Sequence, residues 1–133
     1  MADLIRFVQQ EFDGIWNTND LEAVMERFAE DAVVRTVPGL PGAPEQFVGK
    51  GQIRGFVQML LVNFHVSSKN FQQDGERVTW FATVTSDSIR AMGVPALDAE
   101  CEAVIRHDKI VSFVPTFTQD TLAKLAAAAG QSR

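Results

Sequence analysis

The spacing of apolar residues changes near Asn63, and this change constrains the fold more than any other feature of the chain. Before it, apolar side chains recur every three or four residues, as on one face of an amphipathic helix. After it, they alternate with polar side chains, as in strands that bury one face. Helices followed by a long run of strands predict an α+β domain, in which helices pack over one face of a bent, mostly antiparallel sheet.

Four helices are predicted, each from one apolar face. Asp3 can cap the first, and its apolar face is Ile5, Val8, Phe12, Ile15 and Trp16. The second begins with Asn19 and Glu22, which resemble a capping box, and its face is Leu21, Val24, Met25 and Phe28. The third follows Gly49 and Gly51, with Ile53, Phe56, Val57, Leu60 and Leu61 on one side. The last is capped by Thr116 or Thr118 and ends at Gly130.

Strands are predicted at 32–37, 64–73, 77–91, 98–107 and 109–117. Asp74-Gly75 is a hairpin signal, and His107-Asp108 is a second short turn. Between the first strand and the third helix, Pro38–Pro44 contains three prolines and two glycines, so it is predicted to be a turn-rich loop.

Length, charge and cysteine content exclude several classes of protein. The 133 residues predict one domain spanning 1–133. A net charge of −5 argues against nucleic acid or an anionic membrane as a partner, because both require a basic surface. No apolar run approaches the roughly 20 residues of a membrane span, and no signal peptide is evident. The single cysteine, Cys101, excludes an internal disulfide and favours the cytoplasm.

Several short motifs occur in the same order as in a known family. They are Trp16-Asn17-x-x-Asp20-Leu21, Phe28-Ala29-x-Asp31-Ala32-Val33, Gly49 before the third helix, Asp74-Gly75-x-x-Val78 and Lys109-Ile110-Val111. In these the chain resembles the nuclear transport factor 2-like superfamily, which includes SnoaL-like polyketide cyclases and proteins with a ketosteroid-isomerase-like fold. The resemblance implies a cone-shaped, strongly curved sheet with helices over its concave face and a pocket between them. Members of the family include isomerases, cyclases, hydrolases and non-enzymatic binders, and many dimerise through the outer sheet face.

The resemblance also implies that this chain lacks the catalytic residues of two known activities of this fold. The aspartate base of ketosteroid isomerases corresponds to Thr36, their helical tyrosine to Phe12, and their second acid falls at or beside Cys101. The strand and loop at 31–41 are similar to those of limonene epoxide hydrolase. Its Asp–Arg–Asp trio falls near Ala82, Val84 and Pro115, and its water-holding pair falls on Val34 and Thr36. None of these residues can take the corresponding role in proton transfer. Glu100 or Glu102 could supply the second acid only if the strand register is shifted by one residue.

The remaining reactive residues form no recognisable cluster. His65 is the best single catalytic candidate, but its position in the alternating pattern places it opposite the apolar face. His107 lies in a predicted turn, and Cys101 alternates with apolar residues and has no base beside it. We therefore expect no metal site and no cofactor, and the identity of any catalytic residue stays open.

The predicted pocket is mainly apolar, and we expect it to bind a hydrophobic small molecule such as a terpenoid, a polyketide or a steroid-like ring. Its predicted lining is Phe12, Trp16, Val34, Thr36, Phe56, Leu60, Trp80, Ala82, Cys101, Phe113 and Phe117. Thr36 is predicted to be the polar group of this lining that contacts the ligand. Whether such a protein is an isomerase, cyclase or hydrolase or only binds its ligand stays open. The alternative is a non-catalytic dimeric module whose pocket is filled by its own side chains.

A homodimer through the outer sheet face is expected because the strand at 109–117 is apolar on both faces. Val111, Phe113, Pro115 and Phe117 alternate with Ile110 and Val114 along it. A monomer with an apolar outer face is the other interpretation.

Overall fold

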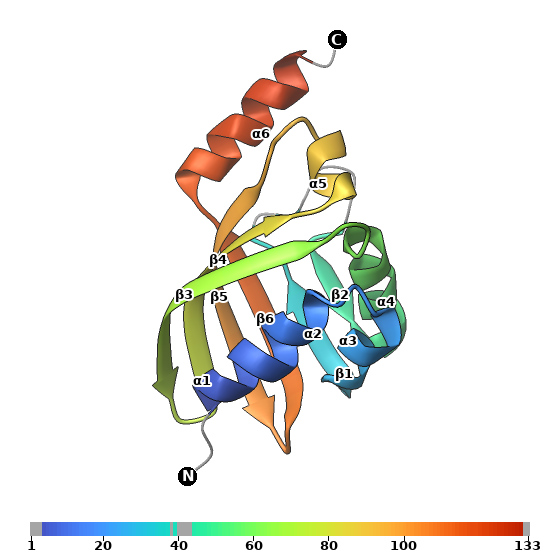
Figure 1. Cartoon of the computed structure of the whole chain (residues 1–133), viewed down its shortest axis with the longest axis vertical. Coiled ribbons are helices and arrows are strands. Elements are labelled where there is room, and N and C mark those ends of the chain that lie inside the picture. The colour runs from blue at the N-terminus through green and yellow to red at the C-terminus, as the bar shows by residue number, and fades with distance from the viewer. Residues whose placement is uncertain (1–3, 38, 40–43, 132–133) are drawn as a thin grey trace.

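A computed structural model describes residues 4–37, 39 and 44–131 of the chain. It has the predicted α+β architecture, with one curved six-stranded sheet and helices inside the curve and at its end (Figure 1). Most of the predicted loop at Pro38–Pro44 lies outside the described residues. No helix among the described residues is long and apolar enough to cross a membrane.

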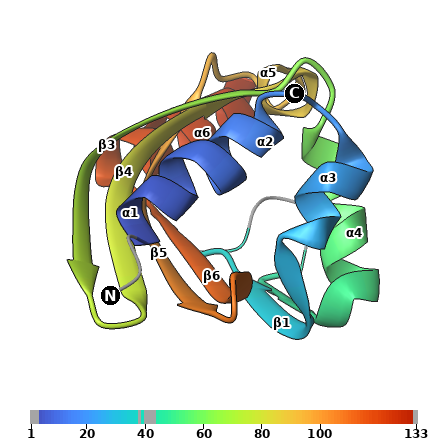
Figure 2. The ribbon, with the colours of Figure 1, turned by 60° about the horizontal axis from the view of Figure 1, so that its bottom comes forward.

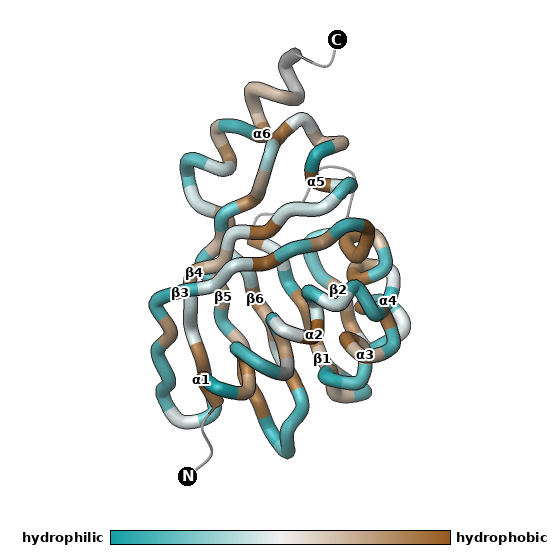
Figure 3. The backbone as a smooth tube through the Cα atoms, in the orientation of Figure 1, coloured by the Kyte–Doolittle hydropathy of each residue, from teal (hydrophilic) through white to brown (hydrophobic). Residues whose placement is uncertain are grey.

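The strands form one sheet in the order β2-β1-β6-β5-β4-β3. Their bounds are β1 Phe28–Arg35, β2 Gln46–Val48, β3 His65–Asp74, β4 Arg77–Thr85, β5 Leu97–Arg106 and β6 Lys109–Phe117. All neighbouring strands are antiparallel except β1 and β6. Figure 2 shows that the sheet curves around the N-terminal helical segments, so its inner face and those helices form the core. Apolar and polar residues are interleaved along the strands, as Figure 3 shows.

The first predicted helix is a continuous run of three segments, α1 (Leu4–Phe7), the π-helical η1 (Val8–Asp13) and α2 (Gly14–Trp16). Leu4, Val8, Phe12 and Trp16 are all buried. In a regular α-helix each residue turns by about 100°, so Leu4 and Trp16 would lie about 120° apart around the axis. A π-helical turn contains more residues than an α-helical turn, so residues that are four apart stay on one face of this helix. The helix therefore departs from the 3.6-residue spacing that the sequence predicted.

The second helix, α3 (Leu21–Glu26), is capped by Asp20, not by Asn19 as predicted. The Asp20 carboxylate accepts a hydrogen bond from the Ala23 amide at 3.2 Å. Asn19 has a left-handed backbone with φ of 58°, and its side chain contacts β3 instead. Phe28, which was placed on this helix, is the first residue of β1, so the strand begins four residues earlier than predicted.

Two further elements differ from the prediction. The strand expected at 77–91 ends at Thr85 and is followed by the helix α5 (Asp87–Ala91). Ser86 ends the strand because its hydroxyl accepts a hydrogen bond from the Ile89 amide, which caps α5. The short strand β2 was not predicted, since three residues carry no detectable alternation.

The helices α4 (Gly49–Leu60) and α6 (Gln119–Gln131) agree closely with their predictions, and Thr118 caps α6. In Figure 1, α6 extends away from the sheet beyond α5. It approaches the turn after α5 so closely that a Cβ added to Gly93 would lie 2.8 Å from the Cβ of Ala128. Gly93 also has a φ of +92°, which is a second reason for glycine at this position.

Candidate functional site

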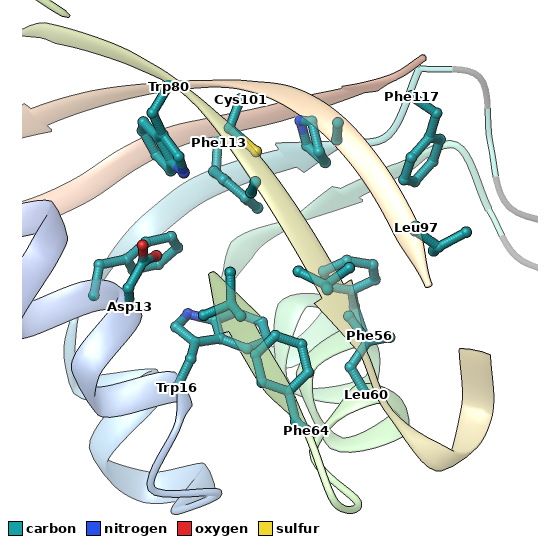
Figure 4. A pocket seen from close by; sticks show the side chains of 16 residues that line it. Asp13, Trp16, Phe56, Leu60, Phe64, Trp80, Leu97, Cys101, Phe113 and Phe117 are labelled. Carbon is teal, nitrogen blue, oxygen red and sulfur yellow. The ribbon is translucent and has the colours of Figure 1, made fainter. Parts of the chain in front are cut away.

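A cavity of about 70 Å³ lies between the N-terminal helical run, α4 and the inner face of strands β3 to β6. Figure 4 shows the side chains that surround it. The lining residues are Phe12, Asp13, Trp16, Phe56, Leu60, Phe64, Val66, Trp80, Ala82, Val84, Leu97, Ala99, Cys101, Phe113, Pro115 and Phe117. The surface that they present is almost entirely apolar.

All but two of the residues predicted to line a pocket lie around this cavity. The alternation along β4 explains why, since Trp80, Ala82 and Val84 share the inner face. Val34 and Thr36 do not line it: both are fully buried beside β2. The Thr36 amide donates to the Glu45 carbonyl at 2.9 Å, and this bond holds the residue in the core. The polar group that the sequence predicted for the pocket, Thr36, is therefore not at this cavity.

The sequence prediction missed Asp13, the only carboxylic acid among the residues that line the cavity. It lies on the helix directly after Phe12 and three residues before Trp16. α-Helical spacing places it beside the apolar face, where an acid is usually solvated. The π-helical segment that ends at Asp13 changes this orientation, and such segments often occur at functional sites. No pattern in the sequence marks the π-turn.

Burial raises the pKa of Asp13 from 3.8 to about 6, while the neighbouring Ser68 hydroxyl acts in the opposite direction and lowers it. The effect of Ser68 is smaller than that of burial, and Ser68 Oγ makes no hydrogen bond of regular distance and angle within the described residues. A carboxyl group with this pKa exchanges a proton near neutral pH, as a general acid or base must.

Trp16 Nε1 is a second polar atom without a partner among the described residues, and its side chain is only 5% exposed. Figure 4 shows the Trp16 indole on the same side of the cavity as Asp13. An unpaired buried donor is costly, so such an atom needs a water molecule or a ligand group as its acceptor.

Cys101 carries the other titratable group of the lining, and it is buried. Burial raises the pKa of the thiol, and the negative charge of Asp13 raises it further. The thiol therefore stays protonated at physiological pH, which makes it a poor nucleophile.

Aromatic rings pack closely around Phe12 and hold the lining of the cavity in place. The Phe12 ring makes edge contacts with Trp16, Trp80 and Phe113 at centroid distances of 5.8, 6.2 and 5.2 Å. The Trp80 and Phe113 rings are stacked at 6.0 Å. These contacts fill most of the space between the helix and the sheet, so the cavity is small.

Two asparagines connect the helical run to the edge strand β3. The side-chain amide of Asn17 exchanges two hydrogen bonds with the backbone of Val66, and that of Asn19 exchanges two with the backbone of Phe64. They fix the helix end that carries Trp16 against Val66 of β3 and against Phe64, which directly precedes the strand, and both of these residues line the cavity.

The two histidines lie away from the cavity. His65 is exposed on β3, as its position in the alternating pattern predicted. His107 is exposed in a two-residue turn with Asp108, and the two residues have φ values of 52° and 60°. The described residues contain no group of three or more His, Cys, Asp or Glu that could hold a metal ion.

Comparison with solved structures identifies the same fold in proteins of low sequence identity. TerC co-crystallised with polyporic acid is 20% identical, with a TM-score of 0.72 over 95% of this chain and 99% of that one. A protein of ketosteroid-isomerase-like fold from Catenulispora acidiphila DSM 44928, in complex with trimethylamine, is 19% identical. Its TM-score is 0.66, with 90% of this chain and 92% of that chain covered.

An NTF2-like protein of unknown function from Cytophaga hutchinsonii ATCC 33406 is 15% identical, with a TM-score of 0.69 over 92% of this chain and 96% of that one. At these identities the likeness shows the fold, and activity must be argued from the site. A search of curated proteins found no match. The model of the SnoaL-like domain family matches residues 8–113. The chain therefore belongs to the SnoaL-like domain family.

Proposed function

We propose that this domain binds a small, mainly apolar molecule against the inner face of the sheet, with Asp13 as its main polar contact. The observation that carries the proposal is a half-buried carboxyl group with a pKa of about 6 beside a cavity that is otherwise apolar. A carboxyl group in such surroundings costs stability, and ligand recognition or proton transfer accounts for its presence.

The size of the cavity limits the ligand. Ligand sites usually measure roughly 300–1,000 Å³, whereas this cavity measures about 70 Å³. Terpenoids and steroid-like rings therefore need a displacement of the lining side chains, while molecules of a few heavy atoms do not. Two structures of this fold were obtained with organic molecules, polyporic acid and trimethylamine, which supports an organic ligand.

A melting-temperature screen over apolar molecules graded by size tests this proposal. We expect a saturable rise in Tm for the smaller members of the series, because a ligand that binds only the folded state stabilises it. Ala82→Leu is the matched control, because Ala82 lines the cavity and is only 3% exposed, so the larger side chain fills the space. The proposal fails if no compound raises Tm, or if the filled variant responds equally.

Acid–base catalysis by Asp13 is an extension of the same proposal. Its pKa of about 6 supports a role in proton transfer, and the residues at the positions of known catalytic groups, such as Phe12 and Thr36, cannot act as bases, which leaves Asp13 as the available base. An activity that is lost in Asp13→Asn while ligand binding persists would support an enzyme over a binding protein.

The second candidate function is a dimeric module with a filled interior, and the small cavity is the observation that favours it. Homodimerisation through the outer sheet face remains a proposal. That face carries a groove of about 500 Å³ lined by residues that include Thr79, Phe81, Glu100 and Val114. The outer face is more polar than the sequence predicted, because Ile110, which alternation placed on the same face as Val114, is fully buried in the core.

A pair of matched substitutions tests the dimer. Val114→Glu places a charge on the half-buried part of the outer face, and Val62→Glu places the same charge on an exposed position away from the sheet. We expect light scattering to report a dimer for the native protein and Val62→Glu, and a monomer for Val114→Glu. A native monomer at high protein concentration contradicts the proposal.

A further inference from the structure

Three polar groups lie between the helical run and the inner face of β3, and two of them form no regular hydrogen bond within the described residues. Trp16 Nε1 and Ser68 Oγ are buried and have no hydrogen-bond partner among the described residues. Ser68 acts on the carboxyl of Asp13, so these two groups are neighbours across the helix and the strand. Asp13 and Trp16 are three residues apart on the helical run, and Figure 4 shows both side chains on the same side of the cavity.

These groups form a site that offers both a donor and an acceptor. Trp16 Nε1 can only donate, ionised Asp13 can only accept, and the Ser68 hydroxyl can do both. Unpaired buried groups cost stability, so a native protein that retains them uses them or fills the site with water. The cavity beside them offers space for an apolar group.

We propose that Asp13, Ser68 and Trp16 bind the hydroxyl group of a small neutral alcohol or phenol whose apolar body occupies the cavity. This inference rests on the proposed function and specifies its ligand class. The ligand hydroxyl donates a hydrogen bond to the Asp13 carboxylate, and its oxygen accepts a hydrogen bond from Trp16 Nε1. Ser68 completes the site by donating to the carboxylate or to the ligand oxygen.

Other ligand chemistries satisfy these groups less well. A carboxylate ligand is repelled by Asp13, and an ammonium ion has no lone pair to accept from Trp16. A ketone accepts from Trp16 but gives ionised Asp13 no donor. A hydroxyl group satisfies both partners with one oxygen atom, which suits a cavity of about 70 Å³.

The size of the cavity also limits the body of the ligand. A cavity of about 150 Å³ holds benzene in another protein, so a single ring enters here only if lining side chains move. The apolar part of the ligand is therefore at most a single ring or a short branched chain, and fused ring systems are disfavoured.

Phenol and toluene form a matched pair of probes for this inference, since they have nearly the same shape and only phenol carries a hydroxyl. Both are titrated into 15N-labelled protein while the two tryptophan indole N–H signals are followed by NMR. Trp16→Phe assigns the Trp16 signal. We expect phenol to bind about tenfold more tightly than toluene, as a hydrogen bond to a charged group predicts. We also expect only phenol to shift the NMR signal of the Trp16 indole N–H downfield.

Variants identify the groups responsible. Asp13→Asn and Ser68→Ala are expected to reduce the preference for phenol, while toluene binds as before. Asp31→Asn is the matched control, because Asp31 is exposed on β1 away from the cavity. A circular-dichroism melt of each variant confirms that it is folded.

The outcomes separate this inference from the proposed function. If toluene and phenol bind equally, or the Trp16 indole signal does not respond to phenol, the hydroxyl site is wrong and the apolar site stands. If neither probe binds and no compound of the size-graded screen raises Tm, both the proposed function and this inference are wrong.

Discussion

The side-chain amide of Asn17 pairs with the backbone of Val66 as a neighbouring strand would. Its Nδ2 donates to the Val66 carbonyl at 3.1 Å, and its Oδ1 accepts from the Val66 amide at 2.7 Å. β3 is an edge strand, so these groups have no strand partner on that side. The pairing fixes the position of the helix that carries Asp13 and Trp16 relative to the sheet.

Asn17→Ala is expected to destabilise the protein by about 1–3 kcal/mol, because two hydrogen bonds are lost and backbone groups of Val66 are left unpaired. Chemical denaturation of the native protein and the variant measures this change. Ser67→Ala, at the exposed neighbouring position on β3, is the control and is expected to change stability by less than about 0.5 kcal/mol. Equal effects in the two variants would contradict the role of Asn17.

Asp13→Asn is expected to stabilise the protein at neutral pH. The pKa of Asp13 rises from 3.8 to about 6 on folding, so the folded state binds more protons than the unfolded state between these values. Stability therefore falls as the pH rises through this window, and above pH 6 the ionised group costs about 2–3 kcal/mol.

Denaturation of the native protein and Asp13→Asn at pH values from 4 to 8 isolates this effect, since other carboxyl groups contribute equally to both. We expect the stability difference to grow as the pH rises to about 6 and then to stay constant. Asp31→Asn serves as the control. A difference that does not depend on pH would mean that Asp13 is not desolvated.

Glycine substitutions are expected to have opposite effects at two positions. Gly93→Ala combines a φ of +92° with a 2.8 Å contact to Ala128, so we expect a loss of about 1–3 kcal/mol. Gly51 lies in α4 with no atom within 4 Å of an added Cβ, so Gly51→Ala is expected to gain about 0.5–1 kcal/mol. Thermal unfolding measures both, and destabilisation by Gly51→Ala would contradict the open space around that residue.

Cys101 is expected to resist thiol reagents in the folded protein. Burial and the negative charge of Asp13 both raise its pKa, and only the thiolate is a strong nucleophile. A chromogenic disulfide reagent is expected to react with one thiol per chain in denaturant and far more slowly without it. Rapid reaction of the folded protein would mean that the cavity opens readily to solvent.

Local patterns in the sequence determined the architecture and much of the cavity lining. The alternation along 77–85 and 97–106 assigns Trp80, Ala82 and Cys101 to one face of the sheet, because the side-chain period of a strand is two. Helical spacing likewise assigns Phe56 and Leu60 to the inner side of α4. These assignments depend only on residues close in the chain, so the sequence alone could supply them.

Tertiary structure decided which polar group reaches the cavity. The π-helical turn at Val8–Asp13 reorients Asp13, and its pKa depends on burial and on Ser68, which is distant in the chain. Thr36, which the sequence favoured, is held in the core by a backbone bond to Glu45. Periodicity records which face of an element is apolar. It does not record a change in helical pitch or the packing of distant segments, and the candidate chemistry of this protein depends on both.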